Sequence, residues 1–134
     1  MNKKVNDDLR RAYDAYSHGD IQGAVASLDI DQEVVWIEPK EFYAGGTYHG
    51  LQGVIDYLTL AYAATSHVLN VPEEIIEVGD KIAVFLHFQA TPKGEGQPRE
   101  GHIADVYTFQ DGKIVQMQAY SDPIEARKAL GLLH

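Results

Sequence analysis

The sequence predicts a single α+β domain in which helices cover one face of a curved sheet. Segments with helical spacing are concentrated in the first half of the chain, whereas the second half alternates like antiparallel strands. The chain has 134 residues, of which 45% are apolar, and this suits one domain with one hydrophobic core. We therefore expect residues 1–134 to form one domain, without a linker or a repeat.

Two helices are predicted at the start of the chain. Residues 4–17 repeat apolar side chains every three or four positions, which is typical of a helix with one buried face. Gly19 ends this helix, and Asp20 is suited to cap a second helix over residues 21–28, because its carboxylate can accept a hydrogen bond from a free backbone N–H group. The apolar positions of the first helix are Val5, Leu9, Ala12, Tyr13 and Tyr16.

A strand, a loop and a third helix follow. Residues 33–39 are rich in Val, Ile and Trp, which predicts a strand that Pro39 closes. Residues 40–50 contain paired glycines and are expected to form a loop. Helical spacing returns over residues 51–64.

Four antiparallel strands and a short last helix are predicted for the rest of the chain. Gly79-Asp80 and Asp111-Gly112 are turn signals between alternating segments, and residues 92–101 read as a polar hairpin loop. Asp122 followed by Pro123 is a typical helix start. The strands are expected at residues 67–78, 81–92, 99–110 and 113–121, and the helix at residues 124–130.

Strand alternation predicts which side chains point into the core. Asp105 falls on the more apolar face of a central strand, where a carboxyl group is unusual. On the last strand, alternation places Met117 inward and Ile114 on the opposite face. The expected inward set is Ile82, Val84, Leu86, Phe88, Ile103, Asp105, Tyr107, Phe109, Val115, Met117, Ala119 and Ser121.

The opposite face of the sheet mixes apolar and polar side chains. Half-apolar faces often pack against a partner, so we predict a homodimer through this outer sheet face, the alternative being a face open to solvent. His87 and His102 are expected to face each other there, as a surface or interface pair. The other members are Phe85, Val106, Gln116 and Tyr120.

Charge argues against two classes of partner. The net charge is −9, and Lys and Arg do not gather into a stripe, so we expect binding neither to nucleic acid nor to an anionic membrane surface. The N-terminal segment lacks the apolar region of a signal peptide, and no apolar run approaches the roughly 20 residues of a membrane span. A cytoplasmic location is therefore predicted.

Several catalytic and cofactor classes are also disfavoured. Cysteine is absent, which excludes disulfides, thiolate nucleophiles and cysteine-based zinc sites. The six histidines show no metal-binding spacing, and the sequence lacks a GxSxG elbow and a phosphate-binding glycine loop. We expect no metal and no cofactor.

Three segments carry a family resemblance. They are AYDAYSHGDIQGAVASL, then VVWIEP followed by GGTYHGLQGVIDYL, and finally ADVYTFQDGKIVQMQAYSD. Together they resemble the nuclear transport factor 2-like superfamily, within its SnoaL-like and ketosteroid isomerase-like branch. The resemblance covers nearly the whole chain and implies a cystatin-like α+β fold, a cone-shaped curved antiparallel sheet wrapped around three helices, with an internal apolar pocket.

The resemblance also implies catalytic roles. Glu38 stands where ketosteroid isomerases have their general base, and Asp105 where they have the protonated acid of the oxyanion hole. The tyrosine of that hole corresponds to Ala12, so Tyr16, one turn later, is the candidate to replace it. Ile103 occupies the place of the arginine of limonene epoxide hydrolase, which counts against epoxide hydrolysis.

Further residues are candidates for ligand binding. Trp36, two residues before Glu38 on the same strand face, offers a planar wall, and His49 precedes the third helix at the expected pocket mouth. Apolar lining is expected from Tyr57, Phe88 and Met117.

Structural interpretations stand beside these functional ones. Asp105 could be a hydrogen-bonded structural acid, Glu38 a solvated strand end, and Trp36 an ordinary core residue. His49 could simply be solvated. Asp122 lies near a carboxylate that SnoaL-like cyclases use, yet helix capping alone explains it.

These residues favour an isomerase, cyclase or dehydratase that applies acid–base chemistry to an apolar carbonyl compound. The alternative is a non-catalytic binding or regulatory module for a small lipophilic ligand.

Overall fold

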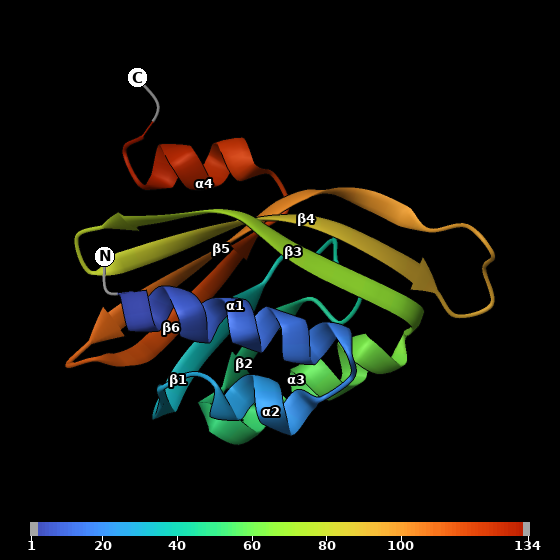
Figure 1. Ribbon diagram of the computed structural model, residues 1–134, viewed down its shortest axis with the longest axis horizontal. Helices are drawn as coiled ribbons and strands as arrows, with labels where there is room; N and C mark the ends of the chain where they lie inside the picture. The colour runs from blue at the N-terminus through green and yellow to red at the C-terminus, as the bar shows by residue number, and fades with distance from the viewer. Residues whose placement is uncertain (1–2, 133–134) are drawn as a thin grey trace.

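The computed structural model describes residues 3–132 and has the α+β architecture that the sequence predicts. A curved sheet carries α1, α2 and α3 on one face and α4 on the other (Figure 1). The elements are α1 (Lys3–Ser17), α2 (Ile21–Ala26), β1 (Ile30–Glu38), β2 (Gly46–His49), α3 (Gly50–Ala63), β3 (Thr65–Val78), β4 (Lys81–Pro92), β5 (Arg99–Gln110), β6 (Lys113–Tyr120) and α4 (Pro123–Ala129). No helix in this described part is long and apolar enough to span a membrane.

The sheet corrects two expectations. Its strand order is β2-β1-β6-β5-β4-β3, and β1 pairs parallel with β6, so the sheet is mixed and not wholly antiparallel. The predicted loop over residues 40–50 contains β2, which forms an antiparallel pair with β1 in which Tyr48 lies opposite Trp36. Gly46 starts β2 with a φ of 137°, a backbone conformation that residues with a Cβ atom rarely adopt.

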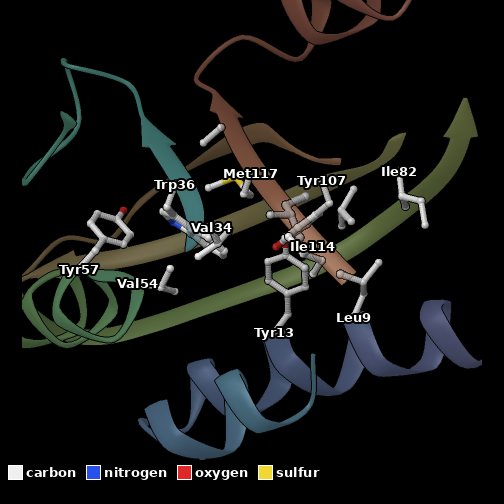
Figure 2. Close-up of a cluster of buried hydrophobic side chains, with 13 residues drawn as sticks. Leu9, Tyr13, Val34, Trp36, Val54, Tyr57, Ile82, Tyr107, Ile114 and Met117 are labelled. Atoms are coloured by element: carbon white, nitrogen blue, oxygen red, sulfur yellow. The ribbon is translucent and has the colours of Figure 1, made fainter. Parts of the chain in front are cut away.

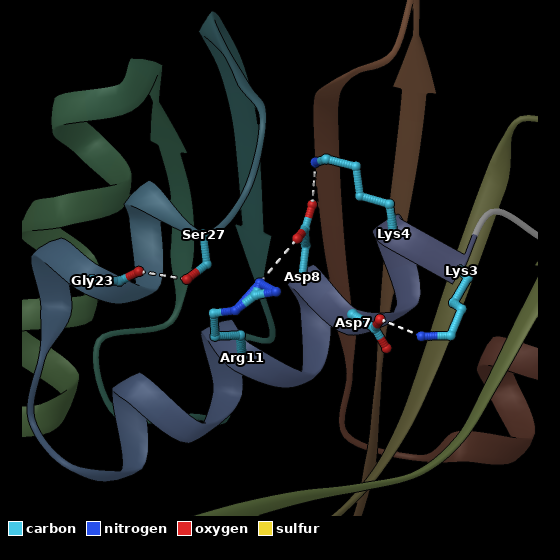
Figure 3. Close-up of polar contacts among 7 residues, drawn as sticks. All are labelled: Lys3, Lys4, Asp7, Asp8, Arg11, Gly23 and Ser27. Atoms are coloured by element: carbon cyan, nitrogen blue, oxygen red, sulfur yellow. Dashed lines mark hydrogen bonds and ion pairs between the residues drawn. The ribbon is translucent and has the colours of Figure 1, made fainter.

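Helix α1 lies along the concave face of the sheet. Its inward side buries Leu9, Ala12 and Tyr13. Its outward side is held by ion pairs four or three residues apart, such as Lys4 with Asp8 at 2.7 Å and Arg11 with Asp8 at 3.2 Å (Figure 3). The helix therefore presents its buried tyrosine directly towards the sheet.

Helix α2 begins at the break that the sequence predicts. The Asp20 carboxylate accepts a hydrogen bond from the backbone N–H of Gly23 at 2.8 Å, which caps the helix. Near its end, the Ser27 hydroxyl donates to the carbonyl of Gly23 at 2.8 Å (Figure 3). This short helix closes one side of the space between α1 and the sheet.

The core lies between the three helices and the concave face (Figure 2). Strand alternation correctly predicts the inward direction of Leu86, Tyr107 and Met117. The prediction that Ile114 lies on the opposite face is wrong, because this residue is 1% exposed and belongs to the same core as Met117. The pairing of β5 with β6 shifts between Thr108 and Phe109, and such a bulge lets β6 bury both residues although they are three positions apart.

Helix α4 covers part of the outer sheet face. Ala126 packs there with Phe85 and Val106. Arg127 places its guanidinium 4.2 Å from the centre of the Phe85 ring and bonds Glu74 at 2.6 Å. Only a part of the predicted dimer face is therefore left uncovered.

Asp122 is the N-cap of α4. Its carboxylate accepts a hydrogen bond from the backbone N–H of Ile124 at 2.9 Å, so the structural interpretation accounts for this residue. We expect Asp122→Ala to lower the free energy of unfolding by about 1 kcal/mol, because a helix N–H group loses its acceptor. Asp122→Asn keeps an acceptor and serves as the control in urea denaturation. Equal stability of the two variants would contradict this assignment.

Candidate active site

A cavity of about 120 Å³ lies among α1, α2, α3 and the concave face of the sheet. Its wall is mainly aliphatic and aromatic, including Leu28, Val54 and Leu86. Two carboxyl groups, those of Glu38 and Asp105, line the same wall. A mostly apolar cavity with a few polar groups is typical of sites that bind small molecules.

Glu38 reaches the cavity as the last residue of β1. Its side chain shares a strand face with Trp36, whose indole N–H donates to its Oε2 at 2.9 Å. The residue is 8% exposed. Burial raises the pKa of Glu38 to about 8, and the nearby charge of Asp105 adds to this, while hydrogen bonds from Trp36 and Tyr57 act in the opposite direction. The interpretation of Glu38 as a solvated strand end is therefore wrong.

Asp105 approaches the cavity from β5. The Tyr13 hydroxyl donates to its Oδ2 at 2.6 Å. Asp105 remains partly exposed, as expected of a group that borders a cavity. Burial raises the pKa of Asp105 to about 6, and the hydrogen bond from Tyr13 partly offsets this.

Tyrosines surround the two acids. The Tyr13 and Tyr107 hydroxyls are 2.7 Å apart, and both side chains are buried (Figure 2). Burial is the main cause that raises the pKa of Tyr13 and Tyr107, and likewise of Tyr16 and Tyr57 beside Glu38. These four hydroxyls therefore keep their protons at ordinary pH and can donate hydrogen bonds.

The structure brings together five of the eight predicted site residues. The cavity lining includes Glu38, Asp105, Tyr16, Trp36 and Tyr57. It also includes Ala12, the position that corresponds to the oxyanion tyrosine of ketosteroid isomerases.

The other three predicted site residues lie outside this cavity. Met117 is fully buried in the sheet between its pairing partners Trp36 and Tyr107. Phe88 lies at the far end of β4, over Gly101 on the neighbouring strand, where it lines a second hollow. His49 is an exposed residue at the start of α3, and its side chain makes no capping hydrogen bond.

Sequence reasoning missed Tyr13 and Tyr107 as site residues. Apolar spacing and strand alternation predict both only as core residues. Tyr107 is two residues after Asp105 on one strand face, so strand alternation alone was sufficient to predict that it lies beside Asp105. Tyr13 is next to the aligned position Ala12, and its link to Asp105 joins residues 92 positions apart, which no local pattern reveals.

The described side chains suggest no metal site. No group of three or more His, Asp or Glu residues within residues 3–132 is arranged to hold a metal ion. His87 and His102 do face each other on the outer surface of the sheet, with ring centres 5.1 Å apart, as predicted. Each contacts a glutamate: His87 lies 3.7 Å from Glu100, and His102 lies 3.3 Å from Glu73.

Comparison with known proteins gives both a family and structural neighbours. The profile described as SnoaL-like domain matches residues 9–117. A search of curated proteins finds no match.

Solved structures share the fold. TerC, co-crystallised with polyporic acid, is 21% identical over 96% of this chain and 98% of its own, with a TM-score of 0.75. A putative SnoaL-like polyketide cyclase from Jannaschia sp. CCS1 is 14% identical over 100% of this chain and 96% of its own, with a TM-score of 0.72. A hypothetical protein with a ketosteroid isomerase-like fold from Catenulispora acidiphila DSM 44928, in complex with trimethylamine, is 13% identical over 96% and 95%, with a TM-score of 0.75. At these identities the likeness concerns the fold alone.

Proposed function

Because this chain belongs to the SnoaL-like domain family, as its resemblance predicted, we propose that it is a cofactor-independent enzyme that moves protons on a small apolar carbonyl compound. Isomerisation, cyclisation and dehydration all fit this chemistry. The observation that carries the proposal is the presence of two carboxyl groups, Glu38 and Asp105, on the wall of one mostly apolar cavity.

The two acids suit proton transfer next to a carbonyl group. One carboxylate must remove a proton from carbon while a donor stabilises the charge that develops on oxygen. With a pKa of about 8 for Glu38 and about 6 for Asp105, the pair holds close to one proton near neutral pH. One member can then act as acid while the other acts as base.

The size of the cavity limits the substrate. Its volume of about 120 Å³ is similar to that of an engineered protein cavity of about 150 Å³ that binds benzene. Trp36 and Tyr57 provide aromatic walls for a flat molecule. We therefore propose a single-ring or short-chain carbonyl compound as the substrate.

Deuterium exchange tests the proposal without knowledge of the product. The protein is incubated in D₂O with a panel of small cyclic ketones and enones, and loss of the proton signal at the carbon next to the carbonyl is followed by NMR. We expect the wild-type protein to accelerate exchange for at least one compound, and the double variant Glu38→Gln, Asp105→Asn to be inactive.

Two outcomes would refute the proposed enzymatic function. One is exchange at the uncatalysed rate for every compound that raises the melting temperature. The other is equal exchange by the wild-type protein and the double variant, provided that circular dichroism shows both to be folded.

Filling the cavity provides an independent prediction. Ala12 is 6% exposed and lines the cavity from α1, so Ala12→Leu should occupy the ligand space. We expect the melting-temperature rise given by an active compound to fall by at least about 2 °C or to vanish. Ala63→Leu, at an exposed position of α3, is the control. An undiminished rise in Ala12→Leu would place the ligand elsewhere.

The second candidate function is a non-catalytic module that holds a small lipophilic ligand. One observation favours it: Ala12 lines the cavity at the position that corresponds to the oxyanion tyrosine of ketosteroid isomerases, and alanine has no hydroxyl group to stabilise a developing charge. For this function, a compound raises the melting temperature but shows no accelerated exchange and is recovered unchanged.

The predicted homodimer stays a proposal, confined to the part of the outer face that α4 leaves open. Leu69 and Val71 are 41% and 42% exposed on β3, and Val71 pairs with His87 on this face. If the dimer forms there, Val71→Glu should give a monomer in sedimentation analysis, whereas Ile124→Glu on α4 should not. A wild-type monomer would remove the proposal. The cytoplasmic location likewise stays a prediction.

A further inference from the structure

We infer that Asp105 is the base of this site and Glu38 its acid, the reverse of the roles that the family resemblance implies, because a chain of tyrosine hydroxyls ends on Asp105 with a short bond, while Glu38 is buried among neutral donors that a protonated carboxyl group can retain. The inference rests on the proposed function and assigns the roles within it.

The hydrogen-bonded hydroxyls of Tyr107 and Tyr13 determine the protonation state of Asp105. Tyr107 is 3% exposed and Tyr13 is 8% exposed, so each hydroxyl proton requires an acceptor inside the protein. One arrangement satisfies both: Tyr107 donates to Tyr13, and Tyr13 donates to Asp105. In the reverse direction, the Tyr107 proton would have no acceptor among the hydrogen bonds of the described residues.

The length of the last bond supports an ionised Asp105. The distance of 2.6 Å between the Tyr13 hydroxyl and Oδ2 falls in the range of hydroxyl-to-carboxylate bonds, which are shorter than bonds between neutral groups. Tyr13 is also the one side-chain hydrogen-bond partner of Asp105 in the described chain. A proton on its other oxygen would point towards the cavity without an acceptor from the protein.

Glu38 has the opposite surroundings. The Trp36 N–H donates to Oε2 at 2.9 Å, an ordinary distance for a neutral pair, and a protonated carboxyl group accepts such a bond through its carbonyl oxygen. The Tyr57 hydroxyl is a second hydrogen-bond partner of Glu38, and the lone pairs of a neutral carboxyl group can accept this bond as well. Glu38 can therefore be neutral and retain both contacts.

The residues around Glu38 also favour its protonated form. Glu38 faces Tyr16 from α1, Tyr57 from α3, Trp36 from its own strand and Asp105 from β5, and none of these carries a positive charge. Its pKa is raised to about 8 and that of Asp105 to about 6, so the single proton near neutral pH belongs on Glu38. This agrees with the hydrogen-bond geometry.

The reaction balances with these roles. Asp105 takes a proton from the carbon next to the carbonyl group, and the C–H electron pair forms a carbon–carbon double bond. The carbonyl electron pair moves to oxygen, which receives the proton of Glu38 and becomes an enol. Asp105 is then protonated and Glu38 ionised. In the reverse steps, Asp105 returns its proton to the same carbon or to a conjugated one, and Glu38 recovers its own, so no further reactant is needed.

Carboxyl NMR tests the proton placement on the ligand-free protein. Two wild-type samples are prepared, one with ¹³C-labelled glutamate carboxyl groups and one with ¹³C-labelled aspartate carboxyl groups. At about pH 7, we expect one protonated glutamate signal, which is missing from Glu38→Gln, and no protonated aspartate. Tyr13→Phe should move the titration of Asp105 to higher pH, whereas Tyr48→Phe should not.

A protonated Asp105 beside an ionised Glu38 would overturn the assignment, as would two ionised or two neutral carboxyl groups at that pH.

The exchange assay separates this failure from that of the proposed function. Exchange activity with an unexpected NMR pattern overturns the roles alone. The expected NMR pattern without any exchange activity supports the proton placement and overturns the enzyme. Roles and function are both supported when the expected pattern accompanies exchange that Asp105→Asn slows at least about tenfold more than Glu38→Gln.

Discussion

Replacing Asp105 by Asn is expected to slow deuterium exchange by about 10²–10⁴-fold while the domain stays folded. An amide cannot remove a proton from carbon. The side chain nevertheless keeps its size, and the amide oxygen can still accept the bond that the Tyr13 hydroxyl now donates at 2.6 Å. The readout is the exchange rate at saturating and at low ketone concentration, with circular dichroism to confirm folding.

The matched variant is Glu38→Gln. Its amide N–H can still donate to the substrate oxygen, so we expect a smaller loss of rate than in Asp105→Asn. Asp56→Asn, on the exposed side of α3, serves as the surface control and should be unchanged. A rate in Asp105→Asn within a few fold of the wild-type rate would leave Asp105 with the structural role that the sequence also allows.

Local sequence patterns were sufficient for much of this fold. The α+β class, the positions of the helices and those of every strand except β2 follow from apolar spacing and from turn residues. Alternation also predicted that Asp105 points inward, and that Trp36 and Glu38 share one strand face. These are short-range properties, which neighbouring residues determine.

Contacts between distant segments were not predictable in this way. The parallel pairing of β1 with β6 joins the two halves of the chain, and nothing in residues 30–38 indicates its direction. The bulge that buries Ile114 depends on the register between β5 and β6. Likewise, the bond between Tyr13 and Asp105 exists only after α1 packs on the sheet.

The same burial that adapts the two acids for proton transfer must affect stability. A carboxyl group with a raised pKa in the folded state is harder to ionise there than in the unfolded chain. Glu38 and Asp105 are therefore expected to stabilise the fold when they are protonated and to destabilise it when both are ionised. Function and stability are linked through these two protons.

Raising the pH from about 4 to about 9 is accordingly expected to lower the free energy of unfolding, with about 3–5 kcal/mol coming from Glu38. The pKa of Glu38 rises from 4.5 to about 8 on folding, and that of Asp105 from 3.8 to about 6. Between these limits the folded state binds more protons than the unfolded state. The stabilising contribution is thus complete below the unfolded values, and it is lost as the pH rises through about 6 for Asp105 and about 8 for Glu38.

Urea denaturation at a series of pH values measures this slope. In Glu38→Gln, the decline between about pH 6 and pH 8 should largely disappear, because the amide does not ionise and the variant should exceed the wild-type protein in stability above about pH 8. Glu33→Gln, at an exposed position of β1, should retain the wild-type slope and thereby account for the general effect of charge. A stability that rises with pH across this window, or an identical slope in Glu38→Gln, would mean that Glu38 is ionised in the folded protein as readily as in the unfolded chain.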